Sequence, residues 1–61
     1  MNTDLLGAKA NVVGPNTVGQ QTHIGAPGHI RAVYLDDGLC VLLSFAEGRM
    51  DTYHVQSVQL T

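Results

Sequence analysis

The sequence predicts one all-β domain built from five strands. From residue 28 onward, apolar and β-branched runs alternate with short breaks that contain glycine, which is typical of strands joined by tight turns. Before that, residues 14–28 hold four glycines and two prolines, a composition typical of a long loop. We expect residues 1–6 to form a flexible N-terminus and residues 7–61 to form the domain.

The first expected strand covers residues 8–13 and ends at a Gly-Pro-Asn turn. A helix over residues 4–10 is the alternative, but Gly7 and the short length argue against it. The Gly/Pro-rich loop between the first and second strands then follows. Ordered loops of this length are uncommon and are often functional.

The later elements are short and closely spaced. The Asp36-Asp37-Gly38 segment is the strongest turn signal in the chain. In order, we expect a strand over 29–35, a hairpin turn over 36–38, a strand over 39–45, a turn over 46–48, a strand over 49–55, a 3₁₀ step over 56–57 and a strand over 58–60.

The strand over 39–45 is apolar on both faces, since Leu39, Val41 and Leu43 alternate with Cys40 and Leu42. A half-buried strand should instead alternate apolar with polar residues. One face is expected to fill the core and the other to need a second cover, for which a partner chain is the first candidate.

The length and charge of the chain restrict the functions that it can have. A 61-residue domain buries only about 60% of its unfolded surface, and Cys40 is the single cysteine, so self-association is a natural source of extra stability. The net charge is −2 and the cations Lys9, Arg31 and Arg49 are isolated, which argues against nucleic-acid binding. No basic start followed by an apolar segment marks a secretion signal, and no apolar run is near the roughly 20 residues that cross a bilayer, so we expect neither a signal nor a membrane span. The lone free cysteine favours the cytoplasm.

The order of a long loop, a three-stranded meander, a one-turn step and a short last strand resembles the SH3-like small barrel. The C-terminal half also resembles the type B trimethoprim-resistant dihydrofolate reductases. The resemblance lies in Gly28-His29-Ile30, in Tyr34, in a strand of matching length with Val41 at its third position, and in Gly48, Tyr53 and Val55. It implies tetramers of such barrels around a pore.

The chain departs from that family at the reaction centre. Met50-Asp51-Thr52 stand where the family has catalytic Val-Gln-Ile, and Gln20 or a neighbour stands where it has a pore lysine. Asp51 would repel negatively charged ligands. We therefore expect the architecture to carry over and the reductase chemistry not to.

The candidate binding residues are two tyrosines and the polar groups near them. Tyrosines at a barrel surface are common interface anchors, although Tyr34 and Tyr53 could equally line the edge of the core. The complete expected set is Tyr34, Tyr53, Asp51, Arg31, Arg49 and Gln20.

The histidines and the cysteine suggest no reaction centre. The histidines at 23, 29 and 54 have no zinc-site spacing, so we expect no metal and no other cofactor. Cys40 lies among apolar neighbours and is expected to be a packed thiol.

These patterns favour a non-enzymatic binding module that self-associates, of a kind that phages or other mobile elements encode as inhibitors or accessory factors. A protein partner or a small ligand would fit it. The alternative is an oligomer that binds a small ligand or nucleotide, or acts as a reductase, in an intersubunit pore lined by Tyr53, Asp51 and Gln20.

Overall fold

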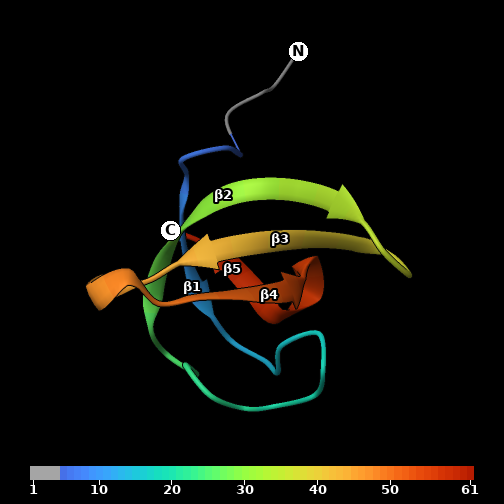
Figure 1. Cartoon of the computed structure of the whole chain (residues 1–61), viewed down its shortest axis with the longest axis horizontal. Coiled ribbons are helices and arrows are strands. Elements are labelled where there is room, and N and C mark those ends of the chain that lie inside the picture. The colour runs from blue at the N-terminus through green and yellow to red at the C-terminus, as the bar shows by residue number, and fades with distance from the viewer. Residues whose placement is uncertain (1–4) are drawn as a thin grey trace.

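A computed structural model describes residues 5–61 and shows five antiparallel strands in one sheet, in the order β4-β3-β2-β1-β5 (Figure 1). The elements are β1 (Lys9–Val12), β2 (Pro27–Leu35), β3 (Leu39–Ser44), the 3₁₀ turn η1 (Ala46–Gly48), β4 (Met50–His54), the 3₁₀ turn η2 (Val55–Ser57) and β5 (Val58–Leu60). The predicted all-β class is confirmed. The sheet is open, with β4 and β5 at its two edges.

The strand boundaries differ from the expected ones by one or two residues. The largest difference is at β2, which begins at Pro27 because Pro27 pairs with Asn11 and Gly28 pairs with Ala10. Proline is tolerated at the first position of a strand, where its missing N–H breaks no ladder. The end of the loop is therefore already part of the sheet.

The β2–β3 hairpin has the predicted turn. Asp37 and Gly38 both have positive φ, at 55° and 113°, and the amide of Asp36 donates to the carbonyl oxygen of Gly38 at 2.8 Å. Aspartate and glycine adopt this backbone region at little cost, which explains their use here. The turn places Leu35 opposite Leu39, and Figure 1 shows the hairpin extending beyond the rest of the sheet.

A β-bulge interrupts the pairing of β2 with β3. Ile30 pairs with Leu43 and Ala32 pairs with Leu42, so Arg31 is an extra residue on β2. A bulge of this kind bends the strand and increases its twist. The bend separates the first part of β2, which pairs with β1, from the second part, which pairs with β3 alone.

The core lies on one face of the bent sheet. Its fully buried members come from β1, β2, β3 and β4: Ala10, Val12, Ile30, Val41, Leu43 and Tyr53. Leu5 packs against this cluster, whereas the expectation for residues 1–4 lies outside the described residues. Within residues 5–61, no helix has the length and apolar character needed to cross a membrane.

Candidate functional site

The long loop between β1 and β2 is fastened to the edge of the sheet by Asn16. The Oδ1 atom of Asn16 accepts hydrogen bonds from the backbone amides of Val18, at 3.1 Å, and Gln20, at 2.8 Å. This is the local turn that asparagine side chains often form with the backbone ahead of them. Because Asn16 is buried, the satisfied oxygen removes a polar group that would otherwise be costly.

The other end of the same amide reaches β4. Asn16 Nδ2 donates to Asp51 Oδ2 at 2.8 Å, and the backbone amide of Thr17 donates to the carbonyl oxygen of Thr52 at 3.0 Å. The hydroxyls of Thr17 and Thr52 are also 2.7 Å apart. These hydrogen bonds attach the loop, which Figure 1 shows curving below β4, to that strand, where it covers part of an otherwise unpaired strand edge.

His23 is the second contact between the loop and the sheet. Its ring stacks on Phe45 with centroids 4.5 Å apart and an interplanar angle of 12°. Its Nδ1 lies 3.4 Å from the hydroxyl of Tyr53 and 4.0 Å from Asp51 Oδ2. Phe45 in turn meets Tyr53 edge to face, with centroids 6.3 Å apart. These contacts join the loop to the core.

Tyr53 forms the floor of this cluster and is only 1% exposed. Its burial, and secondarily the negative charge of Asp51, raise the pKa of the phenol above its usual value. The hydroxyl therefore stays protonated at neutral pH and acts as a hydrogen-bonding group rather than as a base. Since these polar groups bond to one another, the arrangement holds the loop in place.

The structure brings together half of the predicted binding residues. Tyr53, Asp51 and Gln20 meet in the cluster around Asn16, where Gln20 Oε1 lies 3.4 Å from Asn16 Nδ2. Sequence reasoning missed Asn16 and His23. An asparagine directly after a proline in a turn was the available signal for Asn16, whereas nothing local pointed to His23.

The other three predicted residues lie elsewhere. Tyr34 is half-buried on the face opposite the core, opposite Cys40 in the register. Arg31 is exposed and its Nε donates to Ser44 Oγ at 2.9 Å, while Arg49 is exposed just after η1. Within residues 5–61 neither arginine forms an ion pair.

Cys40 is a buried thiol, a weak donor that faces two backbone carbonyl oxygens. Its Sγ lies 3.5 Å from the carbonyl oxygen of Asp36 and 3.6 Å from that of Gly38, so the S–H points into the hairpin turn. The expectation of a packed thiol is confirmed. Among residues 5–61 there is no cluster of three or more His, Cys, Asp or Glu side chains that could hold a metal ion.

The second face of the strand over 39–45 was expected to need a partner chain as cover, but the burial of Cys40 shows that most of this face is already covered. The outer side of β3 is largely covered within one chain, because Cys40 is fully buried and Leu42 is half-buried. The uncovered leucines lie instead at the open end of the core face. Leu39 is 41% exposed and its register partner Leu35 is 80% exposed.

An apolar groove of about 300 Å³ opens at this end of the core face. It is lined only by aliphatic side chains: Leu5, Ile30, Leu39, Val41, Val55, Val58 and Leu60. Ile30 and Val41 belong to the buried core, whereas Leu39 and Leu60 stand exposed at the rim. The groove is therefore a place where the core reaches solvent. We name it the apolar groove.

Comparison with known proteins gives no relative: no family, no curated protein and no solved structure matches this chain.

Proposed function

We propose that this protein is a small, non-enzymatic binding module on an SH3-like barrel that pairs with a second copy of itself at the apolar groove. The barrel proposal is supported by the strand order, the bulge that bends β2, the long loop after β1 and the one-turn step η2 before β5. Bending one sheet in this way is how a short chain encloses a core.

The observation that carries the pairing is the apolar groove together with its rim. Exposed single leucines are ordinary, but a contiguous apolar surface marks an interaction site. Here Leu39 and Leu60 stand at the rim of a groove whose floor is the core itself, and the exposed Leu35 is the register partner of Leu39. Burial of one such side chain contributes about 1.5–3 kcal/mol, so a few of them are enough for specific association.

The edge of β2 beside this groove favours a second copy as the occupant. Among residues 5–61, β1 pairs with β2 only at its start, at Pro27, Gly28 and His29, and no strand pairs with the same edge of residues 32–35. A free strand edge is a template for another strand. Two copies joined antiparallel at this edge would extend both sheets and place their apolar rims against each other, which is the self-complementary geometry of a two-fold dimer.

Sedimentation equilibrium of the wild type and of two matched variants tests this proposal. Leu35→Glu places a charge on the register partner of the rim residue Leu39, at the proposed β2 edge, and Val18→Glu places the same charge on a loop residue that is 75% exposed. We expect a dimeric wild type and Val18→Glu variant, and a dissociation constant raised about tenfold or more by Leu35→Glu.

A wild type that stays monomeric up to about 1 mM, or two variants that dissociate equally, would overturn the proposal. Both side chains are mostly exposed in the single chain, so neither substitution removes a core contact. Circular dichroism of each variant checks that its fold is retained.

The alternative, a ligand-binding or reductase-type pore lined by Tyr53, Asp51 and Gln20, has less support. Tyr53 is buried and Asp51 accepts hydrogen bonds from Asn16 and from the amide of Thr52. Exposure of these groups would require the loop to leave β4. Saturation binding of folate or a nicotinamide nucleotide that broadens the amide signals of these residues would favour the pore.

A further inference from the structure

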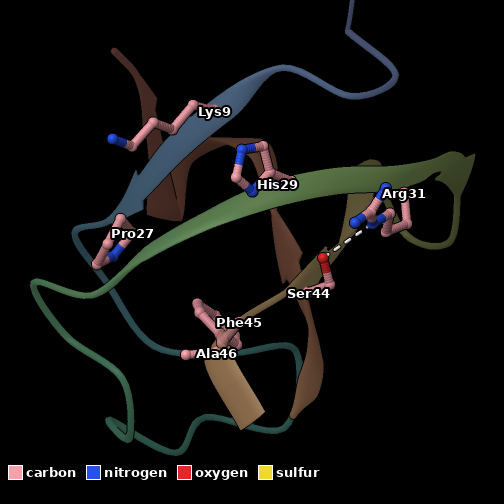
Figure 2. Close-up of a pocket in the computed structure, with 7 residues that line it drawn as sticks. All are labelled: Lys9, Pro27, His29, Arg31, Ser44, Phe45 and Ala46. Carbon is pink, nitrogen blue, oxygen red and sulfur yellow. Dashed lines mark hydrogen bonds between the residues drawn. The ribbon is translucent and has the colours of Figure 1, made fainter. Parts of the chain in front are cut away.

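A second concave surface lies on the face of the sheet opposite the core. Its volume is about 400 Å³ and its walls come from β1, β2, β3 and the start of η1 (Figure 2). The lining residues are Lys9, Pro27, His29, Arg31, Ser44, Phe45 and Ala46. We name it the basic pocket.

Strand register explains why these side chains meet. Lys9 pairs with His29, and His29 pairs with Ser44, so the three form one row across β1, β2 and β3. Residues directly opposite in antiparallel strands have Cβ atoms about 4.5–5.5 Å apart. Lys9, His29 and Ser44 therefore lie in one row on this face, although they are far apart in the sequence.

The bulge adds the arginine. Arg31 is the extra residue of β2, and its Nε donates to Ser44 Oγ at 2.9 Å, as the dashed line in Figure 2 shows. This hydrogen bond fixes the guanidinium at one side of the pocket. A guanidinium carries five N–H donors, so its terminal groups remain to bind an anion.

The pocket is positively charged, whereas the chain as a whole is negatively charged. The whole sequence has three lysines and arginines and a net charge of −2, yet Lys9 and Arg31 both line this one pocket. Within residues 5–61, neither of them pairs with a carboxylate. An anion in this pocket would be attracted by both cations.

The opposite wall is apolar and fixed. Phe45 lies against Gly28, where a Cβ atom would come within 3.1 Å of its ring and 2.9 Å of the carbonyl oxygen of Ser44. His23 stacks on the same ring from the loop. Phe45, Pro27 and Ala46 thus give the pocket an apolar side next to its cations.

We propose that the basic pocket binds a small organic phosphate, with its phosphate between Lys9 and Arg31 and its ring or hydrocarbon part against Phe45. The pocket has donors from three strands in its lining, which suits a tetrahedral anion better than a flat carboxylate, and arginine binds phosphate with paired hydrogen bonds. A polymer of phosphates would need cations beyond the pocket, and Arg49 is the only other one in the sequence. The site lies on the opposite face from the apolar groove and is independent of self-association.

Titrations followed by amide chemical shifts test the proposal on the whole chain. The probes are phenyl phosphate, inorganic phosphate and a single-stranded oligonucleotide. We expect saturable shifts at Lys9, His29, Arg31 and Ser44 with phenyl phosphate, and weaker binding of inorganic phosphate, which cannot contact Phe45.

Three neutralising variants complete the experiment, because the chain offers a matched control. We expect Lys9→Gln and Arg31→Gln each to weaken phenyl phosphate binding about tenfold, as the loss of one charge-assisted hydrogen bond predicts. Arg49→Gln removes the same charge outside the pocket and should leave the affinity unchanged. All three side chains are exposed, so the fold should persist.

Three results would overturn the proposal. One is the absence of any shift up to about 10 mM phenyl phosphate, where a millimolar site would be mostly filled. Another is an equal loss of affinity in Arg49→Gln, which would indicate general attraction to charge. The third is tighter, strongly salt-dependent binding of the oligonucleotide, which would indicate a nucleic-acid surface instead.

Discussion

Replacement of Asn16 by alanine should release the long loop from the sheet. The side chain accepts hydrogen bonds from the amides of Val18 and Gln20 and donates to Asp51 Oδ2, with distances between 2.8 and 3.1 Å. Alanine keeps the backbone and removes all three. It also leaves a half-buried carboxylate with one donor fewer, the remaining one being the amide of Thr52.

The size of the effect follows from these bonds. Two neutral hydrogen bonds contribute about 0.5–1.5 kcal/mol each, and one to a charged group contributes about 1.5–3 kcal/mol. Because the bonds share one side chain and are not additive, we expect a loss of about 2–4 kcal/mol in the free energy of unfolding. A chain of this length has a total stability of about 3–9 kcal/mol, so the melting temperature should fall by at least 10 °C, roughly.

Thermal and urea unfolding measured by circular dichroism would show this change. Asn11→Ala is the matched control, because Asn11 is half-buried in β1 and makes no side-chain hydrogen bond within residues 5–61. The double variant of Asn16→Ala with Asp51→Asn separates the contact with β4 from the local turn. A stability loss below about 0.5 kcal/mol, the range of ordinary surface changes, would refute the idea that Asn16 anchors the loop.

Two further changes follow from the geometry. Gly28→Ala should destabilise the fold by about 1–3 kcal/mol, because its Cβ would meet the Ser44 carbonyl oxygen at 2.9 Å; urea unfolding that shows equal or higher stability would contradict this contact. The raised pKa of Tyr53 means that, above about pH 10, the folded chain keeps a proton that the unfolded chain has lost. Stability should therefore fall as the pH rises past that value. Tyr53→Phe should lack this part of the decline, and parallel urea-denaturation curves for the two proteins from pH 8 to 11 would count against it.

Local chemistry made the strands predictable. Glycine and aspartate in the hairpin turn, and the continuous apolar run of residues 39–45, are signals carried by neighbouring residues, and both agree with the structure. Pro27 was assigned to the loop because residues 14–28 are rich in glycine and proline, but its pairing with Asn11 makes it the start of β2. That partner lies 16 residues upstream, so no local pattern could reveal it.

The candidate sites were harder to predict because they depend on register. Asp51 and Gln20 were predicted as binding residues, but Asn16, which contacts both of them within one chain, is recognisable only once the loop is placed on β4. Lys9 and His29 seemed isolated in the sequence for the same reason. Pairing of β1, β2 and β3 brings Lys9 and Arg31 to one pocket, and the sequence alone does not show this pairing.

The bulge at Arg31 has a consequence for how this sheet can change. An insertion into a regular strand would turn every following side chain to the wrong side. Here the added residue is absorbed locally, so Val33 and Leu35 keep the orientation that their pairing with Val41 and Leu39 requires. The side chain at this position can therefore change without altering the packing of the core, so the outer surface and the hydrophobic interior can be altered independently.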